Sequence, residues 1–376
     1  MKIALISVSD KTNLSKLAQF LLQNDYRLLS TGGSYKHIVS NTPQELQDRI
    51  QTVENFTGFP EILEGRVKTL HPKIHAGILS NRSNKKHQNQ MNKNKFKNID
   101  LIIVNFYPFQ ETVIKNKNKN SIIENIDIGG PTMVRAAAKN FRDVTIITDK
   151  NDYESLINQL NKNKGSTSLN FREYMASKAF GLTAYYDSII SNWFNKELNI
   201  SFPNTMTIPG KKLAQLRYGE NPHQKSSIYL NTVNDKEIGL RKISGKNLSY
   251  NNYNDIFSGL EILGSLNKTG TVIIKHANPS GVSMDASPLK SFKNALSCDP
   301  VSAFGGIVAC NFNINKKIAE EISKTFFEVI LAKKFDKEAL KILLSRKKLI
   351  LIDISKFKLT SDNQIKSFDN SFLIQD

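Results

Sequence analysis

The sequence has few cysteines, few acidic residues relative to basic ones, and no long apolar run. Only Cys298 and Cys310 occur in 376 residues, too few for a disulfide scaffold, which favours a reducing, cytoplasmic setting. No run of about 18 apolar residues is present, so no membrane-spanning helix is expected. The first apolar run, residues 3–8, is too short for a signal peptide and is interpreted as a strand. The 39% hydrophobic content indicates a globular chain.

Acidic residues are outnumbered 34 to 52 by Lys and Arg, which gives a formal net charge of +18. Such an excess commonly indicates a nucleic-acid partner. Much of it, however, lies in Lys/Asn tracts such as residues 81–98, which contain no acid and almost no aromatic side chain. A single-strand binder needs aromatic rings on which bases stack. The tract therefore favours a solvated surface loop, and no specific nucleic-acid partner is expected.

Short apolar runs alternate with helical patterns in the first half of the chain. Residues 3–8, 101–104 and 144–148 predict buried strands, and Leu14, Leu17, Ala18, Leu21 and Leu22 have helical spacing. This alternation predicts a parallel α/β sheet, in which ligands bind at the carboxyl ends of the strands. Hydroxyls, glycines and a lysine occupy those ends, which suits a phosphate. The turns concerned are residues 7–11, 30–34, 105–107 and 127–130.

A second α/β segment follows a loosened stretch. Residues 199–212 are rich in proline, glycine and polar residues and predict an interdomain linker. A strand is predicted at residues 271–275, followed directly by residues 276–281, His-Ala-Asn-Pro-Ser-Gly. The chain therefore predicts two domains.

The segment GRVKTLHPKIHAG, residues 65–77, gathers Arg66, Lys68, His71, Lys73 and His75 without an acid. A metal pair, a nucleic-acid patch and a pocket for a small anion are the three interpretations. A proline separates the two histidines and no third ligand stands at a suggestive spacing, so no metal is expected. The anion pocket fits these residues better.

Long motifs in collinear order carry a resemblance to a known family. They are ALISVSDKT, STGGS, TGFPEILEGRVKTLHPKIHAGIL, NFYPF, ENIDIGGPTMVRAAAKN, LRYGENPHQ, KNLSYNN, KHANPSG and DPVSAFGGIVA. Together the motifs closely resemble the bifunctional purine-biosynthesis enzymes that join IMP cyclohydrolase to AICAR transformylase.

The resemblance implies an α/β fold with two domains. Residues 1–198 would form a methylglyoxal-synthase-like parallel-sheet domain, with residues 199–212 as the linker. Residues 213–376 would form the N-terminal part of a cytidine-deaminase-like transformylase domain. The sequence stops where the family normally continues much further, so this domain is expected to be incomplete.

For cyclisation of formyl-AICAR to IMP, the resemblance implies four catalytic residues. Lys139 would move protons, Lys68 would stabilise the oxyanion, and Tyr107 and Asp127 would orient and polarise the reacting groups. Without the resemblance, Lys139 reads as part of an exposed basic helix face, and Ser9 and Asp10 read as helix caps. The implied nucleotide-binding residues are Ser9, Asp10, Lys11, Thr31, Gly32, Gly33, Ser34, Arg66, Val67, Thr69, Val104, Asn105 and Ile128.

For formyl transfer to AICAR, the resemblance implies His276 as proton acceptor and Lys275 as transition-state stabiliser. AICAR would contact Arg217, Tyr218, Gly305 and Glu328. The cosubstrate would be 10-formyltetrahydrofolate, whereas the cyclohydrolase needs no cofactor. A homodimer is implied, with AICAR, formyl-AICAR and IMP as the small-molecule partners. Departures from the family pattern are Leu182 for a histidine, Ser280 for a cysteine and Lys333 for a proline.

The cyclohydrolase is therefore expected to be intact, and the transformylase is expected to be impaired. Three rival interpretations remain. The chain could be a catalytically impaired nucleotide-binding remnant or an assembly module. It could be a basic nucleic-acid protein, with steeply salt-dependent binding. A zinc deaminase is disfavoured because the His-x-Glu and Cys-x-x-Cys pattern is missing.

Overall fold

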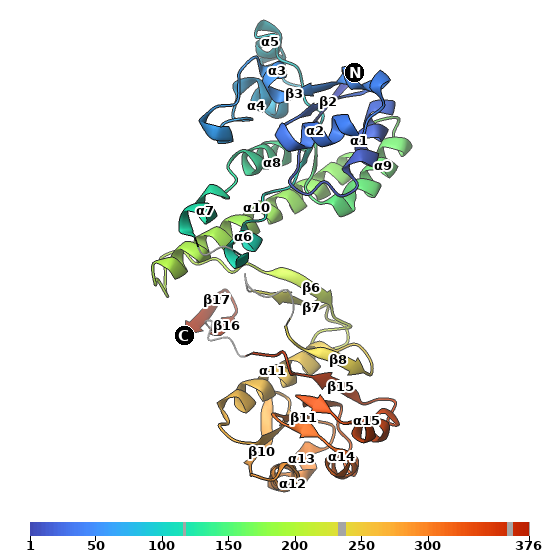
Figure 1. The fold of residues 1–376 in the computed structure, drawn as a ribbon, viewed down its shortest axis with the longest axis vertical. Coiled ribbons are helices and arrows are strands. Elements are labelled where there is room, and N and C mark those ends of the chain that lie inside the picture. The colour runs from blue at the N-terminus through green and yellow to red at the C-terminus, as the bar shows by residue number, and fades with distance from the viewer. Residues whose placement is uncertain (116–117, 232–237, 359–363, 376) are drawn as a thin grey trace. The chain divides into compact units, whose positions relative to one another are not determined.

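A computed structural model describes residues 1–115, 118–231, 238–358 and 364–375. The chain folds as two compact α/β units, Met1–Pro209 and Gly210–Asp376 (Figure 1). The division falls within residues 199–212, the predicted linker. Each unit is described by itself.

The first unit contains a parallel sheet in the order β3-β2-β1-β4-β5. The strands predicted at residues 3–8, 101–104 and 144–148 are confirmed within one or two residues, and so is the parallel arrangement. One short strand, β3, was not predicted, because three residues give no readable periodicity. The strands are β1 (Lys2–Ser7), β2 (Tyr26–Ser30), β3 (Ile50–Thr52), β4 (Leu101–Val104) and β5 (Thr145–Ile147).

Helices of the first unit cover this sheet. The helix predicted from Leu14 is α1, and its five predicted apolar positions are buried. Among the described residues, no helix is both long and apolar enough to cross a membrane. The α-helices are α1 (Leu14–Gln23), α2 (Gly32–Ser40), α3 (Val53–Thr57), α4 (Pro72–Leu79), α5 (Lys85–Lys93), α6 (Phe109–Lys115), α7 (Lys119–Glu124), α8 (Gly129–Lys139), α9 (Tyr153–Lys162) and α10 (Leu169–Glu197). Three 3-10 helices are η1 (Gln44–Arg49), η2 (Leu63–Gly65) and η3 (Lys150–Asp152).

The Lys/Asn tract at residues 81–98 is not the surface loop that its composition predicted. Helix α5 occupies its middle, because the Asn84 side chain caps the helix by accepting the N–H groups of Lys86 and His87. Met91 is buried and anchors the helix to the unit. The buried Met91 and the Asn84 cap thus stabilise a helix in a segment whose polar composition is typical of a loop.

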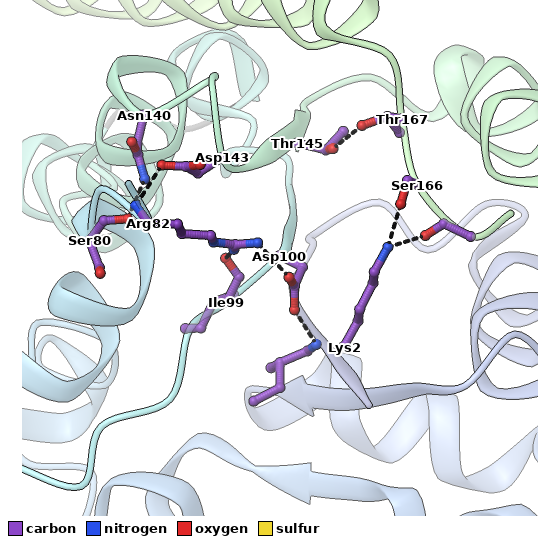
Figure 2. A network of polar contacts seen from close by, with 12 residues as sticks. Lys2, Ser80, Arg82, Ile99, Asp100, Asn140, Asp143, Thr145, Ser166 and Thr167 are labelled. Atoms are coloured by element: carbon purple, nitrogen blue, oxygen red, sulfur yellow. Dashed lines mark hydrogen bonds and ion pairs between the residues drawn. The ribbon is translucent and has the colours of Figure 1, made fainter. Parts of the chain in front are cut away.

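A polar network ties the amino ends of the parallel strands together (Figure 2). The Asp100 carboxylate accepts the Ile3 N–H at 2.7 Å and the Arg82 guanidinium at 2.9 Å. The N–H of Arg82 donates to Asp143 at 3.0 Å, and the Lys2 ammonium donates to Ser166 at 2.7 Å. These contacts lie at the starts of β1 and β4, at the opposite end of the sheet from the predicted ligand-binding turns.

The second unit contains a six-stranded mixed sheet in the order β10-β9-β11-β13-β15-β8, in which β11, β13 and β15 are parallel. Alternate residues of β9 point to opposite faces: Val272 and Ile274 pack with Ile256 and Leu260 of α11, whereas Ile273 packs with Phe292 of α12. The sheet therefore lies between two helical layers. The cytidine-deaminase-like assignment stays a prediction.

The strands of this unit are β6 (Lys211–Gln215), β7 (Ser227–Leu230), β8 (Arg241–Ser244), β9 (Gly270–Lys275), β10 (Asn278–Met284), β11 (Ile307–Cys310), β12 (Asn313–Ile314), β13 (Val329–Ala332), β14 (Lys334–Phe335), β15 (Ile350–Asp353), β16 (Gln364–Phe368) and β17 (Ser371–Gln375). The helices are α11 (Tyr250–Ser265), α12 (Pro288–Cys298), α13 (Pro300–Ala303), α14 (Lys316–Ile322) and α15 (Lys337–Leu344).

Candidate functional site

The predicted turns of the first unit meet where the chain order of the sheet reverses, between β1 and β4. Asn105 follows β4, and its Oδ1 accepts the N–H groups of Ser9 and Asp10 at 2.6 and 3.1 Å. Its Nδ2 donates to the Asp10 carbonyl at 3.1 Å, and the Ser9 hydroxyl donates to the Phe106 carbonyl. The turn after β1 is therefore fixed to the turn after β4. Such a switch point is where open α/β sheets bind ligands.

The amino end of α2 forms the next wall of the site. Thr31 caps the helix in an extended conformation, and its carbonyl accepts the N–H groups of Ser34 and Tyr35. The buried Ser34 hydroxyl exchanges two hydrogen bonds with the Val8 backbone, so this side chain fixes the turn and is not aimed at a ligand. The Gly32 and Gly33 backbone is exposed at the helix N-terminus. This end of α2 can therefore accept an anion.

Two lysines from distant parts of the sequence lie over these glycines. A side-chain carbon added at Gly33 would lie 3.8 Å from the Lys11 ammonium, and one added at Gly32 would lie 4.0 Å from the Lys68 ammonium. Gly32 also adopts φ +34°, a region that glycine occupies without strain. The two ammonium groups and the helix N-terminus together form a positively charged cradle, which is complementary to a phosphate or an oxyanion.

Residues Glu61 to Thr69 form a tight turn beside this cradle. Ile62 and Val67 pair as an isolated antiparallel bridge. Lys68 is 2.9 Å from the Glu61 carboxylate, and the exposed Arg66 is paired with Glu124. The predicted binding residue Val67 thus contributes backbone structure, while Lys68 contributes the charge.

The remaining members of the basic segment have separate structural partners. His71 caps α4 by accepting the Lys73 N–H on Nδ1 at 3.1 Å. The Lys73 ammonium donates to the Phe56 carbonyl and lies over the Phe56 ring. Burial lowers the pKa of the half-buried His75. In the described part of the chain, no three His, Cys, Asp or Glu side chains are grouped as metal ligands would be.

Asp127 lies at the amino end of α8. Its carboxylate accepts the Gly130 N–H at 2.8 Å. Burial raises the pKa of Asp127, and hydrogen bonds from the backbone N–H groups of Gly130 and Tyr107 partly offset this effect. The buried Thr69 hydroxyl adjoins Gly129, because a side-chain carbon there would lie 2.7 Å from it. Asp127, Tyr107 and Thr69 are therefore neighbours, with the exposed Ile128 beside them.

Lys139 does not join this group within one chain. It is the last residue of α8, ten residues beyond Gly129 and therefore about 15 Å along the helix axis. Lys139 lines a separate cavity of about 660 Å³ between α4, α8 and α10. The other lining residues are His75, Leu79, Thr132, Arg135, Ala136, Ala138, Phe141, Glu173, Ala176, Ser177 and Phe180. Within one chain, the length of α8 thus separates Lys139 from Gly129, which adjoins Thr69, the residue after Lys68.

Three residues near the cradle were not identified from the sequence. Lys150 is 2.8 Å from the Asp10 carboxylate, which also accepts two hydrogen bonds from Thr12. Glu61 pairs with Lys68, and the Tyr186 hydroxyl accepts the Asp127 N–H at 2.8 Å. Lys150 stands just after β5, so the rule applied to the other strand ends would have found it. Glu61 and Tyr186 gave no comparable signal.

The predicted residues of the second unit gather around the first turns of α11. The Glu328 carboxylate accepts the side chain of the buried Asn252 at 3.1 Å. Lys275 donates to the Phe304 carbonyl at 2.8 Å, directly before Gly305. Arg217 lies over the ring of Tyr218 at 5.0 Å, and the following turn is joined to α11 by the Asn251 side chain, which donates to the Glu220 carbonyl.

Asp255 is the residue of this second group that was not identified from the sequence. Its carboxylate accepts the Ala277 N–H at 2.7 Å and lies close to His276. Both His276 and Ala277 have left-handed backbones, with φ of 54° and 58°. Burial raises the pKa of Asp255. The carboxylate thus holds an unfavourable backbone turn that directs the predicted proton acceptor.

Comparisons with known proteins show which families and structures the chain resembles. A family model described as the AICARFT/IMPCHase bienzyme matches residues 137–376, and one described as an MGS-like domain matches residues 13–132. A solved structure titled "Crystal structure of ForH" is 30% identical and has a TM-score of 0.46, covering 51% of this chain and 98% of that chain.

Similar proteins named bifunctional purine biosynthesis protein PurH occur in several bacteria. The one from Bradyrhizobium diazoefficiens is 45% identical, and the alignment covers 93% of this chain and 66% of the relative. Those from Thermoanaerobacter sp. (strain X514) and Persephonella marina are 42% and 43% identical, covering 100% and 99% of this chain and 73% of each relative. The chain therefore belongs to the AICARFT/IMPCHase family of bifunctional purine biosynthesis proteins.

Proposed function

We propose that the first unit closes the ring of formyl-AICAR to give IMP and water. The observation that carries this proposal is the convergence of Lys11 and Lys68 on the Gly32-Gly33 end of α2. A nucleoside monophosphate brings a dianion to such a site. The hydrogen bonds from the Ser9 and Asp10 N–H groups to Asn105 hold the neighbouring turn in a fixed shape.

Ring closure requires the carboxamide nitrogen to attack the formyl carbon. As the C–N bond forms, the nitrogen loses a proton and the formyl oxygen gains negative charge. An ammonium group such as that of Lys68, held beside the cradle, stabilises this oxyanion. The oxygen takes up the proton lost by the carboxamide nitrogen and becomes a hydroxyl group. The C–O bond then breaks as the formamide nitrogen gives up its own proton and forms the ring C=N bond, and the second proton completes the departing water. One proton carrier can serve these transfers in turn.

Asp127 is suited to carry that proton within one chain. Its pKa is raised by burial, which makes its carboxylate a stronger base than an exposed one. It adjoins Tyr107 and Thr69, the residue after Lys68, whereas Lys139 lies at the far end of α8. We therefore propose Asp127 as the proton carrier. The role of Lys139 stays a prediction that rests on family resemblance.

Formyl transfer to AICAR by the second unit is a second proposal. Lys275, His276 and Glu328 lie around the start of α11 with Asn252 and Asp255 behind them. The cosubstrate would be 10-formyltetrahydrofolate. The chain spans 66% to 73% of the lengths of the relatives it matches. The transformylase activity remains a proposal, and so do the homodimer and the cytoplasmic location. Light scattering of the purified chain would test the homodimer.

The test is a pair of assays on the purified full chain. Formyl-AICAR should yield IMP at a rate well above that of the buffer, and AICAR with 10-formyltetrahydrofolate should yield formyl-AICAR if the second proposal holds. A chain that binds IMP but does not accelerate cyclisation would instead be a nucleotide-binding remnant, an alternative that the remote position of Lys139 favours. No formyl transfer above the buffer rate would contradict the second proposal and leave the first untouched.

A further inference from the structure

The Lys68 ammonium, which lies near the amino end of α2, is also paired with a carboxylate. Glu61 and Lys68 stand just outside the Ile62–Val67 bridge, on facing arms of the turn, and their charged atoms are 2.9 Å apart. Their side chains are 32% and 33% exposed, so the pair is partly shielded from solvent. Shielding strengthens an ion pair relative to one at a free surface.

The turn between these arms has an unusual backbone that fits this pair. Leu63, Glu64 and Gly65 have consecutive φ values of 53°, 54° and 94°. A side-chain carbon at Gly65 would lie 2.6 Å from the Glu61 carboxylate and 2.6 Å from the Lys68 side chain. The ion pair therefore lies directly against the Gly65 backbone, where only glycine leaves room for it.

A lysine in this cradle needs such a restraint. Its four-carbon stem is flexible, and Lys11 presents a like charge at the neighbouring glycine. One N–H of the Lys68 ammonium is directed to Glu61, which leaves the other two free to serve a ligand over Gly32. Because the carboxylate is attached to the opposite arm of the turn, it fixes the ammonium in direction as well as in position.

We propose that Glu61, seated against Gly65, is a positioning residue that holds the Lys68 ammonium over the amino end of α2. The inference rests on the proposed cyclisation. Glu61 acts through Lys68 and does not itself touch the substrate. Its loss should therefore lower the rate of ring closure more than the affinity for nucleotide, because the oxyanion exists only as the reaction proceeds.

The experiment measures cyclisation kinetics and IMP binding by calorimetry in the full chain. Glu61→Gln should lower kcat about tenfold or more and change the IMP dissociation constant less than about threefold. Glu64→Gln, the same change at an exposed position of the same turn, is the matched control and should leave both values within about twofold. Glu61→Asp keeps the charge and should restore part of kcat.

A double-mutant cycle distinguishes positioning from a general loss of structure. Glu61→Gln introduced into a Lys68→Met chain should cause no further fall in kcat, because the group that it positions is already gone. Three outcomes would each overturn the inference. The folded Glu61→Gln protein could keep the wild-type kcat, it could bind IMP more tightly than wild type, or Glu61→Gln could lower kcat further in the Lys68→Met chain. If Glu61→Gln does not fold, Glu61→Asp is measured in its place. Because its shorter side chain should hold Lys68 less well, a wild-type kcat in Glu61→Asp would then overturn the inference. A wild-type chain that fails to cyclise formyl-AICAR would instead refute the proposed function.

Discussion

Asn105 bonds to both backbone groups of Asp10, accepting its N–H and donating to its carbonyl, each at 3.1 Å. One side chain after β4 thereby sets the shape of the turn after β1. Asn105→Ala should leave the turn without these bonds and raise the IMP dissociation constant about tenfold, which corresponds to about 1.4 kcal/mol for ordering the loosened turn when IMP binds. Calorimetry would measure this. Asn94→Ala, at the exposed end of α5, should leave IMP binding unchanged.

The proton carrier can be identified by comparing Asp127→Asn with Lys139→Ala. If Asp127 carries the proton, Asp127→Asn should lower kcat for cyclisation at least a hundredfold. Lys139→Ala should then lower it much less. A large loss in Lys139→Ala with a small loss in Asp127→Asn would reverse the assignment and bring Lys139 to the substrate by a route outside a single chain.

The pH dependence of cyclisation offers a second check on Asp127. Burial raises the pKa of its carboxyl above the ordinary 3.8. A base works only when deprotonated, so kcat/KM should fall as the pH drops through this raised pKa. The acid limb should therefore lie above pH 3.8 in the wild-type chain and be missing from the residual activity of Asp127→Asn. An acid limb of equal midpoint in both proteins would exclude Asp127 as its source.

Lys150 should influence the free energy of unfolding through Asp10. Hydrogen bonds from Lys150 and Thr12 hold the pKa of Asp10 far below its ordinary 3.8. A lowered folded-state pKa stabilises the fold above pH 3.8, and this contribution is lost as the pH falls through the folded pKa. Lys150→Met should therefore be slightly less stable than wild type at pH 7, and the difference should shrink below pH 3.8. Urea unfolding at several pH values would show it, and an unchanged difference would argue against the linkage.

The network at Asp100 should matter for stability but not for catalysis. Its carboxylate is only 17% exposed and binds both Arg82 and the Ile3 N–H. Asp100→Ala leaves the Arg82 guanidinium without its carboxylate and the Ile3 N–H without an acceptor, and should cost about 2–4 kcal/mol in urea unfolding. The exposed Glu197→Gln should cost less than about 0.5 kcal/mol. Cyclisation at 25 °C by the folded fraction of Asp100→Ala should equal that of wild type.

Sequence reasoning located the strands of the first unit and the turns at their carboxyl ends. It succeeded there because buried strands leave a strong local signal in runs of β-branched residues, as at residues 101–104. The same reasoning did not find Glu61, Lys150 or Asp255, since each acts on a partner brought close by the fold. Helix α5 was also missed, because Asn84 and Met91 outweigh a polar composition that is typical of a loop.

Family resemblance extended the site list further than local patterns could, but it carried no geometry. It grouped Lys139 with Lys68, and only the length of α8 shows that they lie apart in one chain. In the second unit it named His276 but not the left-handed turn that Asp255 holds. Residue identity can be transferred between relatives, whereas distances have to be established in the folded chain.

The Arg82 and Asp100 network (Figure 2) stands at the amino ends of the parallel strands, whereas the lysine cradle stands at their carboxyl ends. The fold's stability and the proposed ring closure would then depend on opposite ends of one scaffold. A well-chosen substitution at the first end should make the protein harder to unfold without changing its turnover.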